Sequence, residues 1–261
     1  MKRTYVKLLI VAGLTGCFLF TSCRSAQETT ARYEISKVEG NMITIDSTWD
    51  ANPDKKATTV LKPYKDKVDA MMYEVIGTSE MKMDKGTPES LLSNLVASVL
   101  QEAAAQVLGK PADMGLVNMG GLRNILPKGD ITVGAVFEIL PFENSLCVLT
   151  MKGTDMKRLF KAIASLHGEG VSGIRLEINK KGELLNATIG GKPVVDDQLY
   201  TVATIDYLAD GNGRMDAFLQ AEKRECPEDA TLRGLFLDYV RKQTAEGKII
   251  TSKLDGRITV K

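Results

Sequence analysis

The stretch DMGLVNMGGLRNILPKGDITVGAVFEILPFEN, residues 113–144, decides the fold and the candidate site of this chain. The apolar run Met114 to Val117 ends at Asn118 and is followed by the glycine pair Gly120 and Gly121, which predicts a buried strand that enters a tight turn. A glycine pair allows positive φ and a close approach of the backbone to a ligand, and an asparagine amide beside it supplies hydrogen bonds.

Two more side chains of this stretch extend the pattern. Arg123 follows the glycine pair and offers a guanidinium fork. A second apolar run ends at Pro141-Phe142-Glu143-Asn144, and we expect this run to be a strand that delivers the Phe142 ring to a loop. From spacing alone two interpretations stay open: a polar turn that faces an aromatic ring across a ligand site, or an ordinary turn with Phe142 in the core.

Length and charge limit the class of protein. With 261 residues, 44% of them hydrophobic, the chain can bury a full core in one domain, with or without a small appendage. The formal net charge is +1, and Lys and Arg are scattered among Asp and Glu. The sequence has no basic stripe, which would indicate a nucleic-acid partner. It also has no acidic tail, which would indicate disorder.

Apolar periodicity predicts a chain of alternating helices and strands. We expect one hairpin at residues 33–45 and a second at residues 174–189. We expect strands at 113–118, 147–151 and 199–205. We expect helices at 57–72, 214–221 and 230–244, the first with Pro63 in its first turn. Two more helices are expected, one from the start signal Thr87-Pro88-Glu89 to Leu108 and one from the cap Thr154-Asp155 to Leu166. Strands that interleave with helices and hairpins predict a mixed α+β sandwich.

The N-terminus has the layout of a secretory signal. Basic residues precede an apolar stretch, Leu8 to Phe20, that is too short to span a bilayer. Phe20-Thr21-Ser22-Cys23 resembles a bacterial lipobox, so we expect Cys23 to carry the lipid anchor; Cys17 is the alternative. The predicted divisions are a lipoprotein signal peptide at 1–23, a tether, hairpin and linker helix at 24–73, and a domain at 74–261.

Two cysteines remain beyond the predicted leader. Cys147 lies in an apolar run, whereas Cys226 lies in a polar Arg-Glu-Cys-Pro loop. An exported protein can form one disulfide from two cysteines, but the different surroundings predict that these two stay unpaired, one as a buried thiol and the other as a loop thiol.

The glycine turn and the segment around Phe142 resemble the signature of the 5′-nucleotidase C-terminal domain. The similarity rests on Asn118-x-Gly-Gly-Leu-Arg123 and on residues 128–144. Further similar segments follow in the family's order and extend the resemblance from about residue 75 to the end: Glu89-Ser90 with Asn94 to Ala97, Met151-Lys152-Gly153, Val171-Ser172-Gly173, Gly191-Lys192-Pro193, Tyr200 to Thr204, Asp206 to Ala209, and Asp255 to Ile258. The resemblance implies the family's mixed α/β sandwich.

The resemblance also implies a site for the nucleoside part of a nucleotide. In the family two rings sandwich the base, and the Asn and Arg of the glycine turn reach the sugar and phosphate. Carried over by position, the substrate-binding residues are Asn118, Gly120, Gly121, Arg123, Phe142, Asn144, Tyr207 and Asn212. The sequence departs from the family pattern in three places: the acid that holds the ribose is missing, which leaves Asn212 as the candidate there, Thr87-Pro88 stands in place of an arginine, and Glu143 replaces a glycine.

The metal-binding half of the family's chemistry is missing from this sequence. A dinuclear phosphoesterase centre needs several imidazoles as well as carboxylates. This chain has one histidine, His167, which we expect at an exposed helix end. We therefore expect no catalytic or metal-ligating residues in this chain, no cofactor of its own, and divalent metals only through a partner metallophosphatase.

Three functional hypotheses follow from the resemblance. In the first, the chain is a lipid-anchored subunit in the cell envelope that recognises the nucleoside or nucleotide while a separate metallophosphatase hydrolyses it. In the second, it is a non-catalytic, membrane-anchored nucleoside-binding protein. In the third, the domain has lost its ligand and remains as an interaction scaffold, which the missing acid and arginine permit.

Overall fold

The computed structural model describes residues 34–261. The predicted signal peptide, with Cys17 and Cys23, therefore lies outside the described residues. The rest of the chain divides into two compact units, with the boundary between Pro53 and Asp54.

The first described unit contradicts the predicted N-terminal hairpin. Residues 34–45 contain no strand, and their apolar side chains are exposed, for example Ile35 at 85% and Met42 at 96%. A two-stranded hairpin is stable only when its apolar face has a surface to cover. The regular element of this unit is the 3₁₀ helix η1, Ser47–Ala51, whose cap Asp46 accepts a hydrogen bond from the Thr48 N–H at 2.9 Å.

The second unit is built on a mixed five-stranded sheet. Its strand order is β10-β4-β9-β2-β5, and only β2 and β9 are parallel. β4 and β9 pair over their whole length, from Leu146 opposite Ile205 to Lys152 opposite Leu199. The strands are β2 Met114–Val117, β4 Leu146–Lys152, β5 Gly170–Ser172, β9 Leu199–Ile205 and β10 Lys223–Glu225. Every residue of β2 is buried, as expected of a continuous apolar run in a sheet covered on both faces.

Two smaller sheets complete the strands of this unit. One has the order β11-β6-β7-β8, and β1 pairs antiparallel with β3 in the other. The bounds are β1 Val75–Ser79, β3 Gly129–Thr132, β6 Ile174–Ile178, β7 Leu184–Ile189, β8 Lys192–Pro193 and β11 Ile258–Val260. The predicted hairpin of β6 and β7 is confirmed, and its turn is closed by Asn179, whose Oδ1 accepts from the Lys181 and Glu183 N–H groups.

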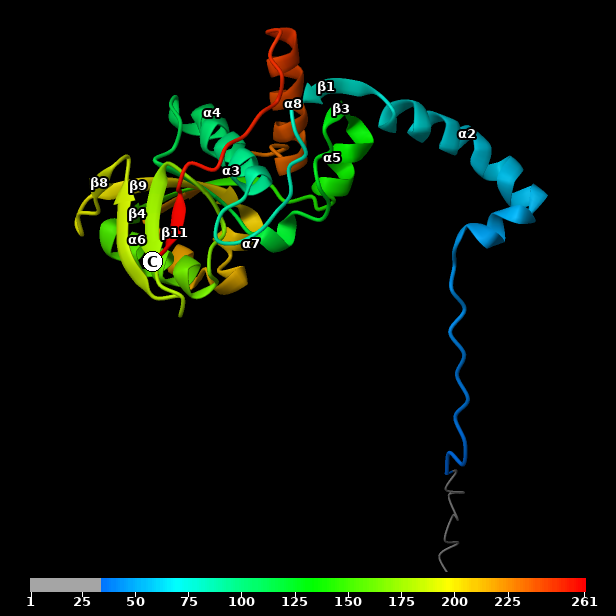
Figure 1. The fold of residues 1–261 in the computed structure, drawn as a ribbon, viewed down its shortest axis with the longest axis horizontal. Coiled ribbons are helices and arrows are strands. Elements are labelled where there is room, and N and C mark those ends of the chain that lie inside the picture. Colours follow the sequence, from blue (N-terminus) through cyan, green and yellow to red (C-terminus); the bar gives the residue numbers. More distant parts are fainter. Residues whose placement is uncertain (1–33) are drawn as a thin grey trace, which may run out of the picture. The chain divides into compact units, whose positions relative to one another are not determined.

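Helices cover the sheets and join them (Figure 1). They are α2 Lys55–Met72, α3 Leu91–Ala103, α4 Ala105–Leu108, α5 Val133–Ile139, α6 Gly153–Ser165, α7 Asp206–Ala209 and α8 Leu232–Ala245, with the 3₁₀ helices η2 Met119–Gly121, η3 Asn212–Arg214 and η4 Asp216–Gln220. α6 contacts β4 and β9 of one sheet and β6 and β7 of the other, while α3 packs on β2, β5 and α8. The predicted α+β sandwich is therefore confirmed.

Within residues 34–261, one stretch is long and apolar enough to cross a membrane, Leu91–Leu108. Half of it is buried inside the protein. Its hydropathy reflects a core position, because α3 inserts Leu92, Val96 and Leu100 against the sheet.

Several predicted helix starts are displaced. α3 begins after Ser90, which accepts from the Ser93 N–H, and not at Thr87-Pro88-Glu89. Glu89 is engaged elsewhere, since its carboxylate accepts from the backbone N–H groups of residues 255–257. α6 begins at Gly153 without a side-chain cap, and the helix predicted at 214–221 is the shorter η4.

α2 confirms the helix predicted at 57–72 but not the place of its proline. Asp54 caps the helix by accepting from the Lys56 and Ala57 N–H groups, and Pro63 lies inside it and not in its first turn. α2 contacts α5, and none of its side chains is fully buried. Its apolar side chains Val60, Leu61, Tyr64, Val68 and Met71 are between 48% and 70% exposed.

Candidate functional site

The glycine turn, Asn118 to Leu122, begins where β2 ends. Asn118 has extended backbone angles and starts η2, and its carbonyl accepts from the Gly121 N–H at 3.0 Å. Gly120 and Gly121 do not have positive φ, so that part of the prediction is wrong. Glycine leaves room for the Asn118 side chain, which lies close to the pair: a Cβ on Gly121 would lie 3.0 Å from Asn118 Oδ1, and one on Gly120 3.3 Å from Nδ2, so a larger residue would require this side chain to shift.

Two charged side chains hold the glycine turn from outside it. Lys85 Nζ donates to the carbonyls of Met119, at 3.4 Å, and Leu122. The Glu169 carboxylate accepts from the Met119 N–H. Neither residue was predicted from the sequence, because each is remote from the turn along the chain and neither belongs to a recognisable motif.

The electrostatic state of Glu169 is unusual. Burial raises the pKa of its carboxyl to about 7, against the opposing effect of the hydrogen bond from the Met119 N–H. The Asn118 amide beside it is also poorly satisfied, since Oδ1 is buried and accepts no hydrogen bond from the described residues. Two polar groups at the glycine turn are therefore unusual: the Glu169 carboxyl, whose pKa is raised to about 7, and the Asn118 Oδ1 atom, which has no hydrogen-bond donor among the described residues.

The Phe142 ring is delivered by a helix and not by the predicted strand. The run Val133–Ile139 forms α5, because Thr132 caps it and Val133, Val136 and Ile139 are buried on one face at helical spacing. The aromatic loop, Leu140 to Asn144, follows. Phe142 is 48% exposed, so the interpretation of this ring as core is wrong.

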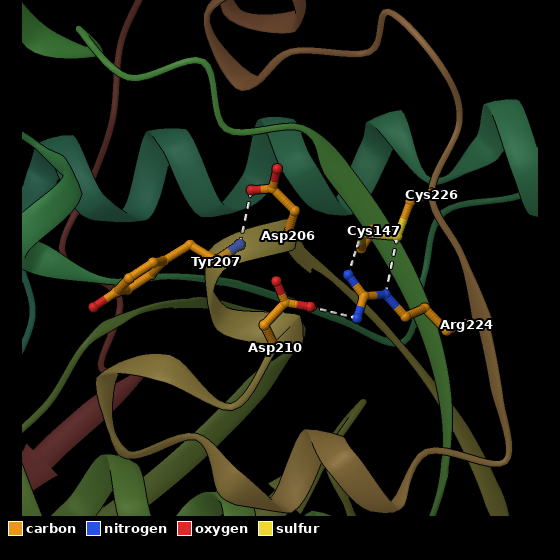
Figure 2. The surroundings of a disulfide bond; sticks show 6 residues. All are labelled: Cys147, Asp206, Tyr207, Asp210, Arg224 and Cys226. Atoms are coloured by element: carbon orange, nitrogen blue, oxygen red, sulfur yellow. Dashed lines mark hydrogen bonds and ion pairs between the residues drawn. A yellow bond between two sulfur atoms is a disulfide. The ribbon is translucent and has the colours of Figure 1, made fainter.

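The second predicted ring lies on α7, directly after the central strand β9. Tyr207 is 44% exposed, while its neighbours Leu208 and Ala209 are buried and anchor the helix. Asp206 Oδ1 accepts a hydrogen bond from the Tyr207 N–H at 2.7 Å. Figure 2 marks this bond with a dashed line. A short helix with two buried residues thus presents one large ring to solvent.

These elements surround one open cavity with a volume of about 310 Å³. It is lined by six of the eight predicted residues: Asn118, Gly120, Gly121, Phe142, Asn144 and Tyr207. Arg123 lies beside the cavity, with its guanidinium carbon 6.0 Å from the Phe142 ring centroid and Nη1 donating to the Gly120 carbonyl at 3.3 Å. Asn212 is exposed at the start of η3 and does not line the cavity.

The structure contains a disulfide between Cys147 and Cys226, so the prediction of two free thiols is wrong. Cys147 on β4 is bonded to Cys226 (Figure 2). The short charged strand β10 pairs with β4, placing Glu225 opposite Val148, and so brings Cys226 to its partner. The charged sequence of β10 does not predict a strand. The sequence therefore contains no sign that Cys226 lies beside Cys147.

Arg224 links this disulfide to α7. Its Nη1 donates to Asp210 at the end of α7 at 2.6 Å, and its Nε and Nη2 lie 3.2 and 3.8 Å from the sulfurs of Cys226 and Cys147. Figure 2 shows the guanidinium between the disulfide and α7. The helix that carries Tyr207 is thereby tied to the edge of the five-stranded sheet.

The described part of the chain holds no group of three or more His, Cys, Asp or Glu side chains that could bind a metal ion. His167 is exposed and lies just after the end of α6, as predicted. Its φ is 62°.

The fold and the cavity define the class of this protein: an α+β sandwich domain with an open, aromatic-lined cavity beside a glycine turn. Residues 75–220 match the family described as the 5′-nucleotidase C-terminal domain, and this match covers more than half of the chain. The chain belongs to that family.

Similar proteins include much larger ones. The endonuclease YhcR of Bacillus subtilis is 28% identical over 188 residues, which are 69% of this chain and 15% of that protein. The trifunctional nucleotide phosphoesterase protein YfkN of the same species is 27% identical over 238 residues, 84% of this chain and 16% of that protein. The crystal structure of a 5′-nucleotidase precursor from Thermus thermophilus has a TM-score of 0.67 and 26% identity, covering 81% of this chain and 44% of that one.

Proposed function

We propose that this chain is a nucleoside-recognition domain for nucleotide hydrolysis, and that a separate metallophosphatase chain supplies the metals and the hydrolytic step. The family and the relatives named as a 5′-nucleotidase and a nucleotide phosphoesterase support the nucleotide part. The sequence has one histidine, whereas a dinuclear phosphoesterase centre needs several imidazoles, so we assign the metals to the partner and no cofactor to this chain.

The observation that carries the proposal is the pairing of Phe142 and Tyr207 at one cavity. Large rings are usually buried, yet these two come from different elements, are half exposed and line the same space. The face of an aromatic ring stacks on any nucleobase. The cavity volume, about 310 Å³, is at the lower end of the range of ligand pockets and suits a nucleoside.

Polar groups of the cavity suit the sugar and phosphate. Asn118 and Asn144 offer amides at the cavity wall, and the glycine turn brings its backbone to the surface. Arg123 is exposed beside Phe142 and has guanidinium N–H groups beyond the one bonded to Gly120, so we assign it to the phosphate side. Asn212 lies outside the cavity wall, and we give it no more than a contact at the margin.

Calorimetry with the soluble chain from residue 24 onward tests this proposal. Adenosine, guanosine and cytidine are titrated beside ribose 5-phosphate, and we expect the nucleosides to bind and the sugar phosphate alone to bind far more weakly. Base stacking on an aromatic ring is worth about 1 to 3 kcal/mol, so Tyr207→Ala and Phe142→Ala should each weaken nucleoside binding about five- to hundred-fold. Both rings are half exposed, so both variants should stay folded.

Tyr73→Ala is the matched control, because Tyr73 is 74% exposed and does not line the cavity. Unchanged affinity in Tyr207→Ala, or no binding of any nucleoside by the wild type, would overturn the recognition role. The scaffold hypothesis would then be the better one. If nucleosides bind but no metallophosphatase associates with the chain in a pull-down, the stand-alone binding protein is the better hypothesis.

We further propose that Cys23 is acylated and holds the chain at a membrane of the cell envelope. The proposal rests on the basic residues, the short apolar run and the small residues at 21 and 22 that precede this cysteine. Labelled fatty acid should be incorporated into the wild type and not into Cys23→Ser. Label that survives in Cys23→Ser but disappears in Cys17→Ser would move the site to Cys17.

A further inference from the structure

A buried arginine lies behind the aromatic loop. Arg233 is the second residue of α8, and its side chain is 9% exposed. Nη1 donates to the Leu140 carbonyl at 3.1 Å, Nη2 pairs with the Glu143 carboxylate, and the guanidinium carbon lies 4.0 Å above the centroid of the Phe137 ring. All three partners belong to the end of α5 or to the aromatic loop, so this one side chain binds both sides of Phe142.

The backbone fixes the end of the same loop to the start of α8. The Leu232 N–H donates to the Asn144 carbonyl and the Leu146 N–H donates to the Ala230 carbonyl, both at 2.8 Å. Before the loop, the Arg123 N–H donates to the Ile139 carbonyl at 2.9 Å and ties α5 to the glycine turn. Residues 140–143 therefore span two fixed points, and the side chain of Arg233 supports the span between them.

The Glu143–Arg233 pair differs from an ordinary surface ion pair. Glu143 is 72% exposed, but its partner is buried, and a guanidinium removed from water is stable only with close compensation. Without the Glu143 carboxylate, the Leu140 carbonyl and the Phe137 ring remain as partners of the buried cation. The loop then loses one of its attachments on the far side of Phe142.

We propose that Arg233 and Glu143 are positioning residues that hold the aromatic loop so that the Phe142 ring faces the cavity. This rests on the proposed function, in which that ring contacts the ligand. The Glu143–Arg233 pair fixes one wall of the cavity before any ligand or partner binds, which lowers the entropy lost on binding.

A double-mutant cycle tests the proposal by calorimetry with adenosine. Glu143→Gln should weaken binding about three- to ten-fold when Phe142 is present, because the Gln amide oxygen can still accept from Arg233 but the hydrogen bond loses its charge assistance. In a Phe142→Ala background the same substitution should change affinity less than about two-fold, because the residue being positioned is gone. The matched control is Glu246→Gln, which removes the charge of an exposed carboxylate paired with Lys248. It should leave the adenosine affinity unchanged in both backgrounds.

A second readout needs no ligand. The sequence has one tryptophan, Trp49, so a Trp49→Phe, Phe142→Trp protein carries its only indole on the aromatic loop. Adding Glu143→Gln should lower its fluorescence anisotropy and raise its quenching by acrylamide, both measured well below the melting temperature, which the weaker compensation of the buried Arg233 guanidinium should lower. Equal losses of affinity in both backgrounds of the cycle, or an indole indifferent to Glu143→Gln, would overturn the proposal. If no nucleoside binds but the indole responds, the proposed function fails while the positioning role stands.

Discussion

Glu169 is the residue whose surroundings most change its chemistry. Its ordinary pKa is 4.5, and burial raises the pKa to about 7 in the folded protein. Lys85 is bonded to the carbonyls on the other side of the turn, and no charged neighbour contributes to the shift. Between pH 4.5 and 7 the folded state therefore binds a proton that the unfolded state has released, and stability falls as the pH rises through this window.

Glu169→Gln should remove this dependence. The variant should be about as stable as the wild type at pH 4.5, and at pH 8 more stable by roughly 2 to 3 kcal/mol, because the wild type must then keep a buried carboxylate ionised. Urea unfolding at pH 4.5, 6 and 8 measures the difference. Glu228→Gln, at an exposed position, serves as control. Parallel pH profiles of Glu169→Gln and the wild type would contradict the shifted pKa.

At the scale of residues, the resemblance located the cavity wall but not its supports. Phe142 and Tyr207 were identified by position in a motif, and the structure brings both to one cavity. Arg233, Lys85 and Glu169 act through contacts with segments that are distant along the chain. A single sequence does not reveal such contacts, because nothing in the local pattern distinguishes a buried arginine at a helix start from an exposed one.

At the scale of elements, apolar periodicity predicted strands and helices correctly where their apolar faces pack on the core. The hairpin of β6 and β7 and the helix α8 appear as predicted, and both pack on the core. The hairpin predicted at 33–45 has the same alternation, but its apolar side chains are exposed and no strand forms. α5 was misread because seven apolar-rich residues fit either a buried strand or two helical turns, and the Thr132 cap was the signal that decides.

The disulfide between β4 and the loop after β10 supplies the prediction at this scale. It closes a sequence separation of 79 residues, and a cross-link over a long loop removes much of the entropy of the unfolded chain. Reduction should lower the free energy of unfolding by about 2 to 4 kcal/mol. Guanidinium unfolding of the wild type with and without dithiothreitol measures this.

Cys226→Ala provides the comparison for the reduced protein. Cys226 is exposed, so the substitution removes the cross-link with little loss of packing, and the variant should match the reduced wild type and be insensitive to dithiothreitol. Arg224 and Asp210 remain to hold α7, so nucleoside affinity should fall less than about three-fold. A wild type equally stable with and without the reductant would show that the sheet pairing alone holds this edge.

At the scale of the molecule, the chain corresponds to a part of its relatives. It spans 15% and 16% of the two curated relatives described above and 44% of the solved 5′-nucleotidase precursor. The helix α2 carries exposed apolar side chains, and the Arg123 guanidinium lies 6.0 Å from the centroid of Phe142, one of the rings that line the open cavity. Because the proposed function takes its metals from a second chain, we expect that partner to dock against the face that carries Asn118, Arg123, Phe142 and Tyr207.

The last prediction concerns that partner. A separate exported metallophosphatase should bind this chain in a pull-down of the purified proteins, and its Michaelis constant should fall about five- to hundred-fold for a nucleotide but little for a small chromogenic phosphate ester. Only the nucleotide has a base to stack on Phe142 and Tyr207, and stacking is worth about 1 to 3 kcal/mol per ring. Tyr207→Ala should erase most of the difference because it removes one of the two stacking rings, whereas Tyr73→Ala, at an exposed tyrosine outside the cavity, should not. An equal effect on both substrates, or no association, would favour the stand-alone nucleoside-binding protein, because aromatic recognition would then operate without being coupled to hydrolysis.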